Sequence, residues 1–184
     1  MYTIRITVVG DGDTGKTSIL IAYKDKAFND QYIPTVFDQY SLDIPIGNEI
    51  FHVILQDTAG QEEFDKLRRF AYNETDVFIM CYSLDNRDSF TNIRDKWAPE
   101  LKALRPRTKL ILIGTKRDLR KKANRPVTRE EGERLARQIK ADGFLETSAK
   151  KMINVEQTFQ LAFVEGAKLI KSKHKKHKST CFML

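Results

Sequence analysis

The chain has 184 residues, the size of one α/β domain, and its two cysteines are too few for a disulfide framework. Its net charge is +7, but residues 168–184 hold six lysines and no acidic residue, which leaves +1 for the rest. The basic charge therefore belongs to a tail and not to a face of the fold. This distribution argues against nucleic acid as a partner and favours an anionic membrane surface.

No apolar run in the sequence approaches the roughly 18 residues of a membrane span. The first nine residues lack the shape of a signal peptide, and position 2 is not the glycine that myristoylation needs. We therefore expect a protein that is made and folded in the cytosol. Cys81 stands in an apolar run and is expected in the core, whereas Cys181, near the end, is expected to take part in chemistry.

Short β-branched or apolar runs alternate with helix-like stretches, which predicts an α/β fold: a mostly parallel sheet with helices on both faces. The predicted strands are Thr3–Val9, Gln39–Ile46, Ile50–Gln56, Asp76–Ser83, Lys109–Gly114 and Phe144–Glu146. The predicted helices are Lys16–Lys24, Arg87–Leu104, Arg129–Ala141 and Val155–Ile170. Gly47-Asn48 between the second and third strands is typical of a hairpin turn, so we expect these two strands to be antiparallel.

The last two helices carry clear local signals. Thr128 precedes Glu130 and Glu131, which predicts an N-cap followed by acids in the first turn. Six small or apolar residues at helical spacing predict a stripe that packs on the sheet: Val155, Phe159, Ala162, Phe163, Gly166 and Leu169. Lys171–Thr180 has the composition of a disordered segment. We therefore expect a domain at residues 1–170 and a disordered polybasic tail at 171–184.

The segment from Gly10 to Thr17, Gly-Asp-Gly-Asp-Thr-Gly-Lys-Thr, follows the first strand and opens the first helix with P-loop spacing. Its glycines allow backbone N–H groups to point at phosphate oxygens. Lys16 supplies a charge for the β- and γ-phosphates, and the Thr17 hydroxyl is suited to ligate Mg²⁺. This motif alone predicts a nucleoside triphosphate site, which kinases and ATPases also have.

Three further motifs follow in order: Asp57-Thr58-Ala59-Gly60-Gln61, Thr115-Lys116-Arg117-Asp118 and Thr147-Ser148-Ala149-Lys150. With the P-loop they resemble the Ras superfamily of small GTPases over the whole chain. The resemblance implies a P-loop NTPase G domain with a six-stranded sheet that binds GTP or GDP with Mg²⁺. Asp118 would accept hydrogen bonds from N1–H and the N2 amine of guanine. Adenine lacks this donor pair, so such a site would reject it by ~10⁴-fold.

The resemblance also implies a role for each matching residue. Hydrolysis would depend on Gln61, which orients the attacking water, together with Lys16, Thr35 and Gly60. Mg²⁺ would be held by Thr17, Thr35 and Asp57. The residues that would contact the nucleotide are Gly12, Asp13, Thr14, Gly15, Lys16, Thr17, Ser18, Phe28, Tyr32, Thr35, Gly60, Thr115, Lys116, Asp118, Leu119, Ser148, Ala149 and Lys150.

Several segments resemble the Rho/Rac branch of the superfamily. They are Tyr32-Ile33-Pro34-Thr35-Val36-Phe37-Asp38, Asp65-Lys66-Leu67-Arg68, Trp97 with Pro99-Glu100-Leu101, and Asp118-Leu119-Arg120. Trp97 taken alone is typical of a half-buried packing residue. Residues 18–40 contain no arginine, which predicts slow intrinsic hydrolysis that a partner's arginine accelerates.

The sequence departs from that branch in three places. Between Arg120 and Thr128 the chain is too short for the helix that Rho proteins usually insert. Asp13 and Thr14 replace small and apolar residues, and an acidic Asp13 would repel the β-phosphate unless it turns to solvent. This motivates a hypothesis of fast nucleotide exchange. Arg69 stands where the branch usually has proline.

Cys181-Phe182-Met183-Leu184 fits the prenylation pattern, with the final leucine favouring geranylgeranyl. The lysines upstream would supply the second signal that one lipid chain needs for stable anchoring. We therefore expect lipidation at Cys181 and a location in the cytosol and on the cytoplasmic face of membranes, the plasma membrane first. His174 and His177 are three residues apart and could bind a metal, but a solvated tail is the preferred interpretation.

The resemblance implies a monomer with several classes of partner. These are exchange factors, activating proteins that supply an arginine, a GDP-dissociation inhibitor, and effectors that bind residues 30–40 and 60–72. It also implies a role in the cytoskeleton.

Two alternatives stay open. The first is a constitutively GTP-bound or fast-cycling scaffold. Thr35, Gly60 and Gln61 stand in their expected places, which argues against a scaffold that holds GTP permanently. A nucleoside kinase is disfavoured because no acceptor-nucleotide lid is visible.

Overall fold

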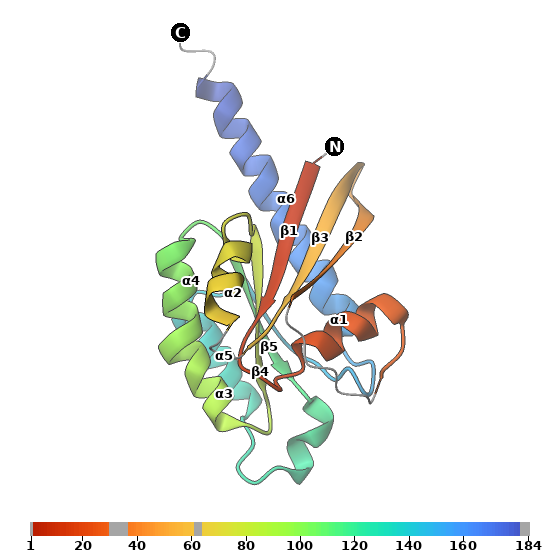
Figure 1. Ribbon diagram of the computed structural model, residues 1–184, viewed down its shortest axis with the longest axis vertical. Helices are drawn as coiled ribbons and strands as arrows, with labels where there is room; N and C mark the ends of the chain where they lie inside the picture. Colours follow the sequence, from red (N-terminus) through yellow and green to blue (C-terminus); the bar gives the residue numbers. More distant parts are fainter. Residues whose placement is uncertain (1, 30–36, 61–63, 181–184) are drawn as a thin grey trace.

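The computed structural model describes residues 2–29, 37–60 and 64–180, and six strands form one sheet (Figure 1). The strands are β1 (Tyr2–Val9), β2 (Phe37–Ile46), β3 (Glu49–Thr58), β4 (Val77–Ser83), β5 (Lys109–Thr115) and β6 (Gly143–Glu146). Their order in the sheet is β2-β3-β1-β4-β5-β6, and every neighbouring pair is parallel except β2 and β3. The predicted α/β architecture with a mostly parallel six-stranded sheet is confirmed.

The antiparallel pair is joined by the turn that the sequence predicts. Ile46 pairs with Glu49, so Gly47 and Asn48 form a two-residue hairpin loop. Gly47 has φ 64°, in the left-handed region that two-residue hairpins require.

The helices cover both faces of the sheet. They are α1 (Lys16–Asp25), α2 (Asp65–Tyr72), α3 (Arg87–Asn92), α4 (Ala98–Leu104), α5 (Arg129–Gln138) and α6 (Val155–Thr180). A π-helical segment, Ile93–Trp97, joins α3 to α4, which accounts for the single helix predicted over Arg87–Leu104. A 3₁₀ helix, Arg117–Lys122, follows β5. At the start of α5, Thr128 and Glu131 form a capping box, which confirms the predicted N-cap.

Alternating residues of the sheet build two cores. On one face, α1 and α6 pack against residues such as Ile79 and Cys81 of β4. On the other face, α2, α3, α4 and α5 pack against residues such as Met80 and Tyr82 of the same strand. Cys81 is fully buried, as predicted, and burial raises the pKa of its thiol to about 12, so it is inert at neutral pH.

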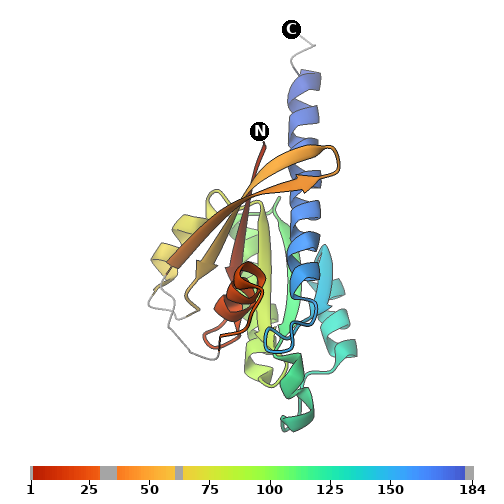
Figure 2. The same cartoon turned by 90° about the vertical axis from the view of Figure 1, so that its right-hand side faces the viewer.

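Helix α6 corrects the prediction of disorder for Lys171–Thr180, because the helix continues to Thr180 and extends beyond the sheet (Figures 1 and 2). Its extension also contacts the body. The Lys171 ammonium pairs with Glu49 beside the β2–β3 turn, and the Lys173 Nζ lies 2.9 Å from Asp76. Lysine is a good helix former, and adding residues to an existing helix is much easier than nucleating a new one.

Helix α2 was not predicted. It has eight residues, four of them charged, and it buries the charged side chain of Arg68, which is 1% exposed, as completely as that of Tyr72. A pattern based on apolar spacing has no signal for such a helix.

The apolar stripe of α6 makes the helix a structural element of the core. The Phe159 side chain is fully buried, and its ring centroid lies 4.3 Å from that of Tyr23 in α1. We expect Phe159→Ala to lower the free energy of unfolding by about 3–5 kcal/mol, because it leaves a cavity between α1 and α6. Val164→Ala, on the exposed side of the same helix, is expected to change it by less than about 1 kcal/mol.

Urea denaturation of both variants under identical conditions tests this expectation. Equal losses in the two variants would mean that α6 does not pack as described.

Candidate functional site

The loop between β1 and α1 has a backbone that only certain residues allow. Gly10 has φ 138°, and a Cβ there would lie 2.2 Å from the Cys81 carbonyl oxygen, so the loop passes directly over β4. Gly15 has φ 80° and begins α1, whose first turn has no side-chain cap. The first N–H groups of α1 therefore remain available to the loop, which is the arrangement that binds phosphate at a helix N-terminus.

Lys16 lies under this loop. Its side chain is 6% exposed, and its Nζ donates to the Asp11 carbonyl at 2.5 Å. Burial lowers the pKa of Lys16, while the nearby Cys81, Asp57 and Asp11 oppose that shift. An anion in the loop would favour the charged lysine, so the site is electrostatically suited to a phosphate.

Two oxygen ligands meet beside the loop. The Thr17 hydroxyl donates to the Asp57 carboxylate at 2.6 Å, and Asp57 is 1% exposed at the end of β3. Thr58 fixes this end of β3 by donating to the Val8 carbonyl of β1 at 2.7 Å. Mg²⁺ prefers oxygen ligands such as hydroxyls and carboxylates. It usually takes only a few of them from the protein and keeps several water ligands, so the pair of Thr17 and Asp57 fits this ion.

Gly60 follows β3 and lies directly against the phosphate loop. A Cβ at this position would lie 2.3 Å from both the Gly12 nitrogen and the Asp11 carbonyl carbon. Only glycine fits there without moving the loop. The structure thus brings Gly60, Thr17 and Asp57 to the loop, as the resemblance implied.

A pocket of about 220 Å³ adjoins the start of α1. Its lining includes ten residues: Gly15, Ser18, Ile19, Phe28, Thr115, Lys116, Asp118, Leu119, Ala149 and Lys150. Nine of these, all except Ile19, are predicted nucleotide contacts. The Lys150 Nζ lies 5.8 Å from the centroid of the Phe28 ring, so the Phe28 ring and the aliphatic stem of Lys150 together form part of the pocket wall. The dimensions and lining suit a planar base.

Ser148 stands behind the pocket and holds Asp118. The Ser148 hydroxyl donates to Asp118 Oδ1 at 2.5 Å, and Ser148 Oγ accepts from the Lys151 N–H at 3.0 Å. Ser148 also forms a β-bridge with Ile153, which fixes the loop after β6. The Asp118 carboxylate thus has one oxygen tied to the protein and can still accept N–H donors from a base.

One side chain joins the base pocket to the phosphate loop. Thr115 Oγ1 lies 2.5 Å from the Thr14 carbonyl and 3.0 Å from the Tyr82 carbonyl. This contact places the pocket immediately beside the loop, at the distance that a nucleoside with attached phosphates requires.

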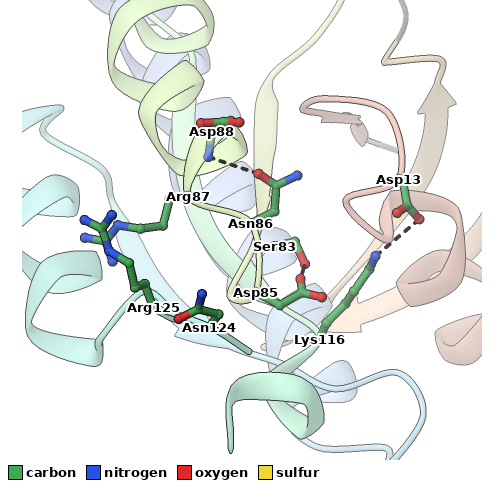
Figure 3. A pocket seen from close by; sticks show the side chains of 9 residues that line it. All are labelled: Asp13, Ser83, Asp85, Asn86, Arg87, Asp88, Lys116, Asn124 and Arg125. Carbon is green, nitrogen blue, oxygen red and sulfur yellow. Dashed lines mark hydrogen bonds and ion pairs between the residues drawn. The ribbon is translucent and has the colours of Figure 1, made fainter. Parts of the chain in front are cut away.

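Asp13 does not point at the phosphate position. Its side chain is 81% exposed, and its carboxylate lies 3.2 Å from the Lys116 Nζ (Figure 3). Asp13 and Lys116 also line a second, open pocket of about 450 Å³. Of the two arrangements that the sequence allowed, the structure has the one in which Asp13 turns to solvent.

The other two departures also have a clear structural outcome. The described chain contains no α-helix between Arg120 and Thr128, in agreement with the absence of an inserted helix. Arg69 lies on α2 and pairs with Glu100 of α4 at 3.7 Å.

Sequence reasoning missed a set of contacts around Asp11. Its carboxylate accepts from Asn92 Nδ2 at 2.6 Å and from Trp97 Nε1 at 2.8 Å. Trp97 is fully buried, and the Arg68 guanidinium lies over its ring at 4.8 Å. Arg68 also donates to the Ala59 carbonyl at 2.7 Å. The sequence did contain a signal for these contacts. A carboxylate such as Asp11 in an anion-binding loop needs hydrogen-bond donors that hold it away from the bound phosphates.

Several predicted site residues lie outside the described part of the chain: Tyr32, Thr35, Gln61 and Cys181. Within the described ranges, no group of three or more His, Cys, Asp or Glu side chains forms a further metal site. None of the helices in those ranges combines the length and the hydropathy of a bilayer span.

The sequence was also compared with models of known protein families. The model of the Ras family matches residues 5–167, which cover most of the 184-residue chain. This range includes strands β2 to β6, most of β1, and both the phosphate loop and the base pocket. The chain therefore belongs to the Ras family of small GTPases, switch proteins that bind GTP or GDP with Mg²⁺ and hydrolyse GTP.

Proposed function

We propose that this GTPase is a Rho/Rac-type switch that cycles between GTP and GDP, with slow hydrolysis of GTP, at the cytoplasmic face of membranes. The observation that carries the proposal is the junction between the phosphate loop and the base pocket, where Thr115 contacts the Thr14 carbonyl. Support for the branch comes from Arg68 and Trp97, two branch-like residues that pack on one another beside Asp11 of the loop.

In this proposal Asp118 reads N1–H and the N2 amine of guanine, and the Ala149 N–H donates to O6. The stem of Lys116 and the ring of Phe28 cover the faces and edge of the base. Ser18, Leu119 and Lys150 complete the pocket.

The phosphates lie in the loop from Gly12 to Lys16, and the helix terminus and the lysine stabilise their charge. Thr17, Asp57 and Thr35 hold the magnesium ion, which neutralises phosphate charge when bound. The Gly60 N–H donates to the γ-phosphate, and Gln61 orients the attacking water.

The proposal predicts slow hydrolysis by the protein alone. Residues 18–40, which follow the phosphate loop, contain no arginine that could reach the γ-phosphate. In a single-turnover phosphate-release assay we expect on the order of 10⁻⁴ s⁻¹, and ~10³–10⁵-fold acceleration by an activating protein that supplies an arginine.

The same assay separates the proposal from its main alternative, a GTP-binding scaffold. Turnover that stays absent with Rho-type and Ras-type activating proteins would favour the scaffold. Fast turnover without any partner would contradict the need for an external arginine.

Asp13 is expected to accelerate nucleotide exchange through its charge. Its carboxylate neutralises Lys116 and adds negative potential beside the phosphate loop. Asp13→Ala should therefore slow GDP release by roughly three- to tenfold at low salt and by less at high salt. Release of a fluorescent GDP analogue measures this effect.

Asp88→Ala is the matched control, because it removes the same charge from α3, another part of the lining of the open pocket (Figure 3). An unchanged or faster release from Asp13→Ala, or an equal slowing in Asp88→Ala, would refute this role of Asp13.

The proposal extends to the membrane, with Cys181 geranylgeranylated and the lysines of the C-terminal helix facing anionic lipid. Effectors would bind through residues 30–40 and 60–72 in the GTP state, and cytoskeletal regulation is the proposed output. Exchange factors, activating proteins and a GDP-dissociation inhibitor would control the cycle.

Membrane binding is tested with prenylated protein and vesicles that contain anionic lipid. Lys175→Gln with Lys176→Gln should reduce binding, because each lysine near the surface contributes ~1 kcal/mol. Lys121→Gln with Lys122→Gln, in the 3₁₀ helix far from the C-terminus, should leave it unchanged (Figure 1). Cys181→Ser should abolish both prenyl incorporation and stable binding, and full binding by that variant would exclude the lipid anchor.

A further inference from the structure

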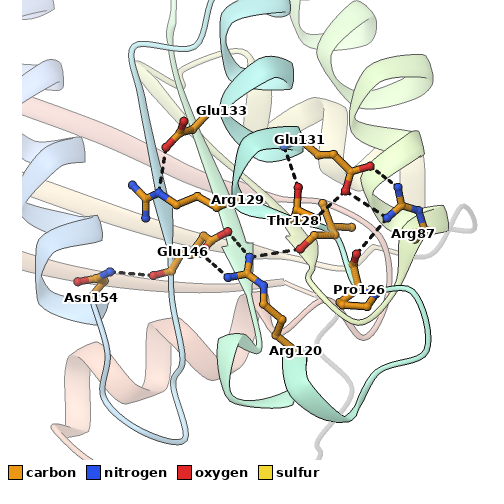
Figure 4. A network of polar contacts seen from close by, with 10 residues as sticks. Arg87, Arg120, Pro126, Thr128, Arg129, Glu131, Glu133, Glu146 and Asn154 are labelled. Carbon is orange, nitrogen blue, oxygen red and sulfur yellow. Dashed lines mark hydrogen bonds and ion pairs between the residues drawn. The ribbon is translucent and has the colours of Figure 1, made fainter.

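A partly buried ion pair joins the two segments that form the base pocket (Figure 4). The Arg120 guanidinium binds Glu146 through two parallel contacts, with Nη1 donating to Oε2 at 2.9 Å and Nη2 donating to Oε1. Glu146 is 2% exposed, and its hydrogen bond with Arg120 raises the pKa of the arginine above its ordinary value. Bidentate pairs of this kind fix orientation as well as distance.

The position of this pair in the sequence relates it to the pocket. Arg120 lies two residues after Asp118, and Glu146 lies two residues before Ser148. The same two segments are joined by the Ser148–Asp118 hydrogen bond and by the Arg117 N–H, which donates to the Thr147 carbonyl at 2.9 Å. Neither Arg120 nor Glu146 lines the base pocket.

Further hydrogen bonds hold the pair itself in place. Arg120 Nη2 also donates to the Val127 carbonyl at 3.2 Å, and Asn154 Nδ2 donates to the Glu146 carbonyl at 2.8 Å. The pair is thus connected to the segment before α5 and to the segment before α6. A carboxylate as buried as that of Glu146 cannot lose its partner without a large penalty, so the geometry has few alternatives.

We propose that the Arg120–Glu146 pair is the positioning device that sets Asp118 at the right distance from the Ser148-Ala149 backbone for guanine. This inference rests on the proposed role of Asp118 as the group that reads the base. Arg120 and Glu146 touch no nucleotide. They determine base selectivity because they keep the carboxylate and the facing loop in register.

The same network contains a natural control. Arg87 binds Glu131 through an equivalent bidentate contact and donates to the Pro126 carbonyl at 3.1 Å (Figure 4). This pair joins α3 to the start of α5 and contacts neither loop of the base pocket. Arg87→Met therefore removes the same chemistry from the same network without affecting the register of Asp118.

The test measures the affinity of the full chain for GDP and for inosine diphosphate, which lacks the N2 amine. A hydrogen bond to a charged acceptor is worth about tenfold to 10²-fold in affinity, so the wild type should prefer GDP by that ratio. Arg120→Met should lose most of this preference and release GDP faster. Arg87→Met should retain it within about twofold.

Two further variants separate positioning from loss of stability. Arg120→Lys retains a charge that can pair with Glu146 and should recover part of the preference for GDP. Arg120→Met combined with Glu146→Leu replaces the ion pair by apolar side chains, which often restores stability. This double variant should be as stable as the wild type yet remain unable to discriminate the two nucleotides.

Asp118→Ala distinguishes failure of the inference from failure of the proposed function. A wild-type preference for GDP in Arg120→Met and in the double variant, with none in Asp118→Ala, would overturn the positioning role alone. An unchanged preference in Asp118→Ala would overturn the role of Asp118 itself, and the positioning inference with it.

Discussion

The organisation of the site depends on one threonine side chain between two loops. Thr115 Oγ1 lies within hydrogen-bonding distance of the Thr14 carbonyl and the Tyr82 carbonyl, so it connects the phosphate loop, β4 and the end of β5. Thr115 is 1% exposed, and water therefore does not compete for these contacts. Its position sets the separation between the base pocket and the loop, and the other groups of the site are arranged around that fixed distance.

A loop that binds anions must keep its own acidic side chains away from them. This loop has two, and the structure treats each differently. The Asp11 carboxylate faces the protein, where Asn92 and Trp97 donate to it. The Asp13 carboxylate faces solvent beside Lys116. The positive end of α1 and the buried Lys16 thus remain the charges nearest to the loop interior, and binding of phosphate stays favourable.

The contacts of Asp11 also connect the loop to the helices on one face of the sheet. Trp97 receives the Arg68 side chain on its ring, and Arg68 holds the Ala59 carbonyl next to Gly60. A displacement of the phosphate loop would therefore be felt at Ala59 and Gly60, just after β3, through packed side chains. Coupling of this kind requires contiguous contacts, and here each contact is a short hydrogen bond or a ring stack.

The sequence was sufficient for those parts of the fold that depend on local signals. Short β-branched or apolar runs located the strands, Gly47-Asn48 located the hairpin, and Thr128 located the start of α5. The glycine and lysine spacing of the phosphate loop located the site, because backbone geometry and charge are both encoded locally there. The base pocket was predicted from the motifs at residues 115–118 and 147–150, which the fold brings together around one pocket.

The missed features depend on contacts between distant residues or on charged side chains in unusual settings. Helix α2 buries an arginine, which apolar periodicity does not detect. The helical end of α6 is stabilised by pairs with Glu49 and Asp76, residues about one hundred positions away. Arg120 and Glu146 stood near recognised motifs, but only the fold brings the two together.

The connection between Arg120 and Thr128 has no inserted helix, and its short backbone lies against the Arg120–Glu146 and Arg87–Glu131 ion pairs. The connection is short enough for its carbonyls at Pro126 and Val127 to accept hydrogen bonds from Arg87 and Arg120. With a longer insertion, the chain would have to leave the body of the protein and return at this point. The Pro126 and Val127 carbonyls would then need hydrogen-bond donors other than these two arginines.

Glu131 shows how closely this region is interconnected. Its carboxylate caps α5 by accepting from the Thr128 N–H at 2.8 Å, and the same group binds Arg87 of α3. The short connection and the cap of α5 are thus held by hydrogen bonds from Arg87 on the α3 side and from Arg120 on the side of the base pocket. At this face the guanidinium groups of Arg87 and Arg120 are already bound to Glu131 and Glu146 of the chain itself. Recognition at this face would have to rely on the remaining exposed groups.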